Sequence, residues 1–188
     1  MRHRIFHFSE PIRGITILFV SSILLLTMHV LDDAFIVGEA AWYGISTAEF
    51  LASLVLIYGI FPPLGLYLVQ RGKVLGFVIL IIYTLQAFYG AGLNHVRHLM
   101  GDFRGSQALN SLLRTFDISV GNLNGQGFWS LLAGMLGLND GVPPHTHSMF
   151  SNVVVFLSIA VNLTLMGFLL FALGQMVARQ LDRRLGPV

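Results

Sequence analysis

Residues 74–93, VLGFVILIIYTLQAFYGAGL, contain no Lys, Arg, Asp or Glu over twenty consecutive positions. The hydrocarbon core of a bilayer is about 30 Å thick, and a helix of about 20 apolar residues crosses it. Three other runs share this character, at residues 15–31, 50–69 and 149–173. We therefore predict an all-α membrane protein in which four transmembrane helices form a bundle, as one integral membrane domain over residues 1–188.

The composition of the whole chain agrees with lipid as its main solvent. Hydrophobic residues make up 55% and charged residues only 11% of the 188 positions, whereas about a quarter of a soluble domain is charged. The chain has no cysteine, which excludes disulfides, thiolate metal ligands and a cysteine nucleophile. The formal charge is only +2, and the basic residues lie at the ends of the apolar runs, so we predict no nucleic-acid partner.

The first apolar run has features of a signal peptide, because Gly38-Glu39-Ala40 resembles a small-residue cleavage site. The apolar core of a signal peptide usually has about 7–15 residues. The run at residues 15–31 is longer than this and is followed by Asp32-Asp33. We therefore expect a span that is retained.

The positions of Lys and Arg predict the orientation. With four spans, the N-terminus, the turn at residues 70–73 and the C-terminus share one side. That side carries eight of the eleven basic residues, which are Arg2, Arg4, Arg13, Arg71, Lys73, Arg179, Arg183 and Arg184. The other side carries Arg97, Arg104 and Arg114. By the positive-inside rule both termini are cytoplasmic, and we expect a bacterial-type inner membrane.

The longest connection, residues 95–148, is predicted to lie on the outer face. Two stretches within it show apolar residues with the spacing of one helical face, and these are Leu109, Leu112, Leu113 and Phe116, then Phe128, Leu131, Leu132, Met135 and Leu136. Each stretch is too short to cross a bilayer. We predict two short amphipathic helices in the membrane interface, which either cover the bundle or form an entrance for lipid.

Two polar residues, Gln86 and Asn162, lie deep inside the third and fourth runs. Lipid offers no hydrogen-bond partner at that depth, so such side chains normally face a neighbouring helix. We predict that both residues hydrogen-bond within the protein and hold the helices together.

Five of the seven histidines are predicted to gather at the outer ends of the spans, together with most of the acidic residues. His29 precedes Asp32 and Asp33 by three and four positions, so one helical face can present all three side chains. His95 and His98 are three positions apart and can likewise share a face.

Further candidates lie in the connections between the spans. His145 and His147 follow two prolines, residues 143–144, and converge only if that segment is extended, which the prolines favour. Asp102 lies beyond the third span, and Glu49 lies at the start of the second. Imidazole and carboxylate groups that project inward from facing helices build metal sites in helical bundles.

The predicted metal ligands are the imidazole and carboxylate groups of His29, His95, His98, His145, His147 and Asp102. The predicted catalytic residues, each acting as a further ligand or as a general base, are Asp32, Asp33 and Glu49. Imidazole ligands suit zinc, iron and copper. No pair has a recognised spacing such as His-Glu-x-x-His, so the prediction depends on convergence of the four spans.

Three functions fit this pattern. The first is a metal-dependent membrane enzyme that acts on a lipid-like or apolar substrate. The second is a quinone-linked electron-transfer subunit with haem b held between His29 and His95, although the neighbouring acids count against an axial pair. The third is a non-catalytic accessory subunit that binds a membrane-protein partner or a second copy. In the simplest alternative these residues only hydrogen-bond to loops and headgroups, with Arg97 and Arg104 paired to the acids.

Overall fold

The computed structural model describes residues 9–104, 111–113, 115–116, 126–136, 138 and 142–185. The described residues are mostly helical and contain no strand. Four helices are long and apolar enough to cross a membrane, and they span Pro11–Val37, Thr47–Gln70, Val74–Leu99 and Met149–Asp182. The predicted all-α chain with four membrane-length helices is therefore confirmed.

The helical elements are named here in the order of the chain. In chain order they are α1 (Ser9–Asp32), the π-helical turn η1 (Asp33–Val37), the 3₁₀ turn η2 (Glu39–Tyr43), α2 (Thr47–Gln70), α3 (Val74–Gln86), the π-helical turn η3 (Ala87–Leu93), α4 (Asn94–Leu99), α6 (Phe128–Met135) and α7 (Met149–Leu185). The first and third membrane-length helices therefore each contain a π-helical segment. Such segments are uncommon and occur frequently at functional sites.

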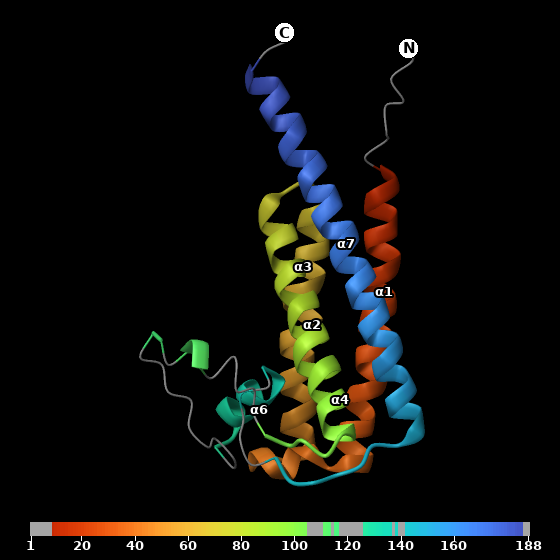
Figure 1. Ribbon diagram of the computed structural model, residues 1–188, viewed down its shortest axis with the longest axis vertical. Coiled ribbons are helices and arrows are strands. Elements are labelled where there is room, and N and C mark those ends of the chain that lie inside the picture. Colours follow the sequence, from red (N-terminus) through yellow and green to blue (C-terminus); the bar gives the residue numbers. More distant parts are fainter. Residues whose placement is uncertain are drawn as a thin grey trace.

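The four long helices pack side by side with their axes roughly along one direction (Figure 1). Helix α1 packs mainly against α7, α2 packs against α3, and α3 also contacts α7. The start of α1 and the end of α7 lie at one end of the molecule, at the top of Figure 1. The opposite end is formed by η1, η2, α4 and the segment that leads into α7, and we call it the histidine end.

The interior between α1, α3 and α7 is apolar, with one polar network in its middle. Buried side chains such as Phe19, Phe77 and Leu165 fill this core. Within it Ser22 Oγ donates to Asn162 Oδ1 at 2.9 Å and lies 2.7 Å from the hydroxyl of Tyr83. The predicted role of Asn162 in holding helices together is confirmed.

Gln86 also forms the hydrogen bonds that were predicted. Its Oε1 accepts from the hydroxyl of Tyr58 on α2 at 2.8 Å. Its Nε2 donates to the carbonyl oxygen of Met135 on α6 at 3.1 Å. Gln86 thus connects three elements near the histidine end.

Helix α6 is the second of the two amphipathic stretches. Leu131 on this helix is buried against Tyr43 and Phe50, whereas Trp129 is 67% exposed. A short helix with a buried side and an exposed side therefore lies at this position. The first stretch lies largely outside the described residues, of which 111–113 are helical.

The outward faces of the long helices are apolar. Phe61 on α2 and Ile82 on α3 are each 61% exposed, and Val55 is 67% exposed. Large apolar side chains that point away from the protein over the length of a helix are suited to contact with lipid chains. The four apolar helices are thus compatible with an integral membrane protein.

Candidate metal centre

The end of α1 carries His29 and the two consecutive aspartates. The helix widens into η1 at Asp33, and Gly38 ends this turn with a positive φ of 75° while its N–H donates to the carbonyl oxygen of Asp33. The i+4 spacing predicted one shared face, and His29 Nε2 lies 3.4 Å from Asp33 Oδ2. His29, Asp32 and Asp33 are all buried.

The turn η3 and helix α4 position His95 and His98. Two glycines allow η3 to approach its neighbours closely, since a Cβ atom at Gly90 would clash with the carbonyl oxygen of Met135, and one at Gly92 would lie 2.7 Å from Ile159. His95 is fully buried by this packing, with 3% of its surface exposed, while His98 is half-buried.

The segment before α7 carries the last two histidines. Residues 142–148 have no regular secondary structure after the prolines. His145 Nε2 and His147 Nε2 lie 3.0 Å apart, as the i+2 spacing predicts for an extended segment. The side chain of His147 points inward and is only 3% exposed.

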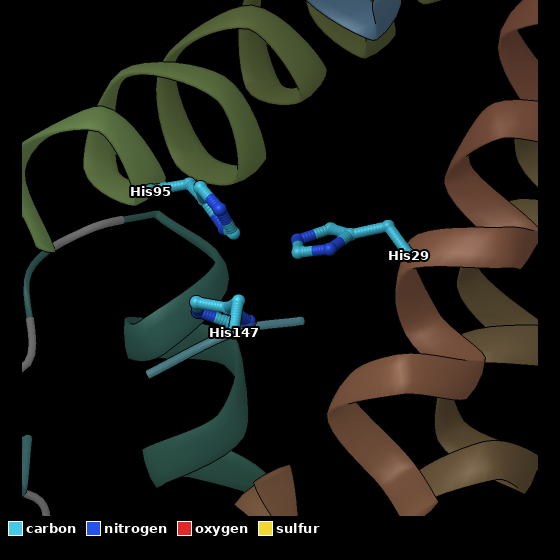
Figure 2. Close-up of side chains that lie close together, drawn as sticks. All are labelled: His29, His95 and His147. Carbon is cyan, nitrogen blue, oxygen red and sulfur yellow. The ribbon is translucent and has the colours of Figure 1, made fainter. Parts of the chain in front are cut away.

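His29, His95 and His147 converge from three separate parts of the chain (Figure 2). Their ring centroids are 3.9 Å apart for His95 and His147, 5.2 Å for His29 and His95, and 5.8 Å for His29 and His147. One ring nitrogen from each can be chosen so that all three lie within 4.8 Å of one another. Three imidazoles at this separation can hold one metal ion.

The carboxylates of Asp32 and Asp33 lie beside one ring nitrogen of His147. Asp32 Oδ2 and Asp33 Oδ1 each lie 3.5 Å from His147 Nδ1. All three atoms are buried without a hydrogen-bond partner. Buried polar atoms are nearly always hydrogen-bonded, and an unpaired buried charge is costly. These atoms are therefore suited to a positive ion between them.

Residues at the start of α7 orient the site. Ser148 Oγ donates to Asp32 Oδ1 at 2.7 Å and accepts from the backbone N–H of Ser151, as a helix cap does. Ser151 Oγ lies 3.1 Å from His29 Nδ1. Groups of this kind fix the orientation of a metal ligand.

Two further hydrogen bonds define which imidazole nitrogens carry lone pairs. His95 Nε2 lies 2.7 Å from Asn152 Oδ1, and His145 Nδ1 lies 2.8 Å from the carbonyl oxygen of Pro143. Both oxygens only accept hydrogen bonds, so these two nitrogens carry protons. The lone pairs of the neutral rings are then at His95 Nδ1 and His145 Nε2.

The electrostatic environment favours neutral imidazoles in the connecting segment. Burial, together with the surrounding histidines, lowers the pKa of His147 to about 2. Burial also lowers the pKa of His145. Neutral imidazole is the form that binds a metal ion.

Sequence reasoning assigned no role to Glu39, which lies on η2 beside the site. Its Oε2 accepts a hydrogen bond of 3.4 Å from the hydroxyl of Tyr43. Burial raises the pKa of Glu39 to about 7. The i+4 spacing of Glu39 to Tyr43 was the only feature of the sequence that indicated this contact. No feature of the sequence indicated the contacts of Ser148, Ser151 and Asn152.

A cavity of about 100 Å³ lies at this point, and its polar lining includes His29, Asp33, Glu39, Tyr43, His95 and His147. A cavity of this size has room for several water molecules or for the polar part of a substrate. Ligand candidates and a carboxyl group of raised pKa thus face one cavity.

Two predicted site residues do not join this cluster. Glu49 is exposed and forms the capping box of α2, where its carboxylate accepts from the backbone N–H of Ser46 at 2.7 Å. Asp102 pairs with Arg97 and Arg104, at 2.9 Å each, and these bonds lower its pKa. Helix capping and ion pairing explain the two carboxylates, and neither belongs to a metal-ligand group among the described residues.

The fold and the site define a helical protein with four membrane-length helices and a histidine–aspartate group that could bind a metal. No protein-family model, curated protein or solved structure matches the chain. The residues of the site are therefore the basis for inferring its function.

Proposed function

We propose that the protein is an integral membrane enzyme that binds a divalent transition metal ion and acts on a lipid-like or apolar substrate. The ligands are the imidazoles of His29, His95 and His147 with the carboxylates of Asp32 and Asp33. The four long helices cross the bilayer as a bundle, with the termini in the cytoplasm and the histidine end at the outer face. The distribution of Lys and Arg supports this orientation.

One observation carries the proposal. Among the described residues, four buried side-chain nitrogen or oxygen atoms lack a hydrogen-bond partner, and three of them are Asp32 Oδ2, Asp33 Oδ1 and His147 Nδ1. The two oxygens each lie 3.5 Å from the nitrogen. Three unpaired electron-pair donors at one buried point are the arrangement that a cation stabilises.

The donor set supports zinc, iron or copper. Imidazole nitrogen suits all three ions, and no thiolate is available in this chain. Catalytic metal sites keep one coordination position open for water or substrate. The cavity beside the site supplies the space for that position.

A bound ion would supply the reaction with an activated water or with a place to bind oxygen. Glu39 is the residue best placed to take a proton in the same cavity. A pKa near 7 is suited to a general base at neutral pH. The hydroxyl of Tyr43 donates to its carboxylate and holds it in position.

An apolar groove of about 300 Å³ beside this cavity supports an apolar substrate. It lies against α2, α3 and α6, and its lining is apolar apart from Tyr58, Tyr83 and Gln86. Tyr58, Gln86 and Met135 line both the groove and the metal cavity. A hydrocarbon chain in the groove would therefore place its polar end near the metal centre. Exposed Phe61 and Ile82 open the groove towards the lipid.

The geometry does not support haem between His29 and His95. The ring centroids of these residues are 5.2 Å apart, and His147 lies 3.9 Å from His95 on the same side. The three rings contact one another, so a porphyrin has no slot between an axial pair.

Metal analysis of the protein in mild detergent, together with an optical spectrum, tests the proposal. We expect at least one ion per chain and no Soret band. Asp33→Asn, which conserves size, and His147→Ala should lose the ion at the described centre, with helix content checked by circular dichroism. Glu49→Gln is the matched control and should keep the metal. Metal-free wild-type protein, or full retention in both site variants, contradicts the proposal.

A further inference from the structure

The metal-ligand groups at the histidine end overlap at one residue. His147 belongs to a group with His29 and His95, to a group with Asp32 and Asp33, and to a group with His98 and His145. The last group was not used in the centre described above. Its rings are close, with centroids 4.9 Å apart for His98 and His145 and 4.8 Å for His145 and His147.

The two ring nitrogens of His147 face different groups. Nδ1 lies 3.5 Å from a carboxylate oxygen of each of Asp32 and Asp33. Nε2 lies 3.0 Å from Nε2 of His145. The two nitrogens of one imidazole point in divergent directions, so they cannot bind the same ion. The residues around His147 therefore surround two separate points.

The lone pair of His145 is directed at the second of these points. Its Nδ1 donates to the carbonyl oxygen of Pro143 at 2.8 Å, which leaves Nε2 unprotonated in the neutral ring. The side chain of Trp42 packs against the ring of His145, and the centroids of the two rings are 4.5 Å apart. This contact restricts the rotation of His145. His145 is thus held with a metal-binding nitrogen towards His147.

We infer that His98, His145 and His147 form a second metal position, so that the centre holds two ions that share the imidazole of His147. This inference rests on the proposed function, because the second ion lies beside the first. An imidazole that binds ions through both nitrogens has lost its ring proton. Binding of the second ion would therefore form bonds to one nitrogen each of His98, His145 and His147, displace water from the ion, and release one proton from His147 to water, with no change of oxidation state.

The second position differs in chemistry from the first. It offers three imidazoles and no carboxylate, since Asp102 is engaged by Arg97 and Arg104. The first position includes the two buried aspartates. Nitrogen ligands bind copper more tightly than zinc or iron by the usual order of affinities. We therefore expect Cu²⁺ to fill both positions.

Counting bound ions in a set of variants tests this inference. The experiment uses the full chain with His3→Ala and His7→Ala, so that histidines of the N-terminal tail add no ion. Titration with Cu²⁺ followed by dialysis should give two ions per chain. His98→Ala and His145→Ala should each give one, Asp33→Asn should keep only the second, and Asp102→Asn should keep two.

Electron paramagnetic resonance tests whether the two ions share His147. Two Cu²⁺ ions joined by one imidazole are magnetically coupled, so the signal of the doubly loaded protein should be smaller than its copper content. The singly loaded His98→Ala variant should give the full signal of one ion. A full signal of two independent ions in the unsubstituted site overturns the shared ligand.

The outcomes separate the two claims. If the unsubstituted site binds no ion, both the proposed function and the second position are wrong. If it binds one ion, and His98→Ala and His145→Ala also bind one, only the second position is wrong. Two ions in all three proteins also overturn the second position, because its ligands would then be unnecessary.

Discussion

Two buried polar clusters in this protein differ in how well their hydrogen bonds are satisfied. In the middle of the helices, Ser22, Tyr83 and Asn162 are joined by hydrogen bonds of 2.7–2.9 Å. At the histidine end, the carboxylates of Asp32 and Asp33 and the ring of His147 each keep one buried atom without a partner. Both clusters draw their residues from segments that are far apart in the sequence.

The difference indicates what each cluster does. A fully satisfied network stabilises one packing of the helices and needs nothing more. A cluster with several unpaired acceptors at one point is stabilised by a positive charge between them. We therefore assign the middle cluster to helix association and the end cluster to metal binding, and each prediction below can contradict one of these assignments.

The largest effect should come from removing the metal. A ligand at about 1,000 times its dissociation constant stabilises a folded protein by about 4 kcal/mol. We therefore expect treatment with a strong chelator to lower the thermal unfolding midpoint in detergent, and readdition of zinc to restore it. Differential scanning fluorimetry or circular dichroism measures the change.

Asp33→Asn distinguishes a metal ligand from a structural carboxylate in the same experiment. Without metal, the wild-type protein buries two carboxylates near each other, and the amide removes one charge. The stripped variant should therefore unfold at a higher temperature than the stripped wild type, although it gains little from added zinc. A stripped variant that is less stable than the stripped wild type would mean that the Asp33 carboxylate has a structural role.

The next effect concerns a residue that orients a ligand. Asn152 accepts from His95 Nε2 at 2.7 Å and fixes the ring that faces the other two histidines. Loss of such a contact typically weakens metal affinity by about 10–100-fold. We expect this loss for Asn152→Ala in competition with a chelating dye, with the same ion count at saturating metal. Unchanged affinity would show that Asn152 does not orient a metal ligand.

The sequence predicted the helices well because lipid demands long uncharged runs. Residues 74–93 alone predict a membrane-length helix. The structure has such a helix at Val74–Leu99, which extends six residues beyond the predicted end. The i+4 pair of His29 and Asp33 was also predictable, since adjacent turns of one helix bring them together. These are local consequences of helix geometry and hydropathy.

The distribution of ligands between groups was not predictable from spacing. His95 and His98 are neighbours on α4, yet they belong to different groups, one with His29 and one with His145. The π-helical turns at Asp33 and at Ala87–Leu93 change the phase of the helix, which sequence periodicity treats as constant. Glu39 and Asn152 act through tertiary contacts, and such contacts leave no pattern in one sequence.

Asn162→Ala is the matched counterpart of Asn152→Ala, ten residues further along the same helix. Its removal deletes the buried hydrogen bond between Ser22 and Asn162 and leaves the hydroxyl of Tyr83 as the partner of Ser22. A buried group that loses its partner costs about 1–3 kcal/mol. We expect a lower unfolding midpoint with unchanged metal affinity, the reverse of the result at Asn152. A loss of metal in this variant would mean that the two clusters are coupled.

The smallest effect should follow Glu49→Gln, at a carboxylate that sequence reasoning assigned to catalysis. Ser46 and Glu49 form a capping box at the start of α2, with the Ser46 Oγ accepting from the Glu49 N–H at 3.2 Å. Glutamine also serves in a capping box, so stability should change by less than about 0.5 kcal/mol. Ser46→Ala, which removes the cap itself, should cost about 1 kcal/mol. If Glu49→Gln instead reduced the metal content, the exposed start of α2 would belong to the metal centre. A carboxylate whose hydrogen bonds are satisfied could then also be a metal ligand in this protein, and unpaired buried oxygens would not identify the ligands.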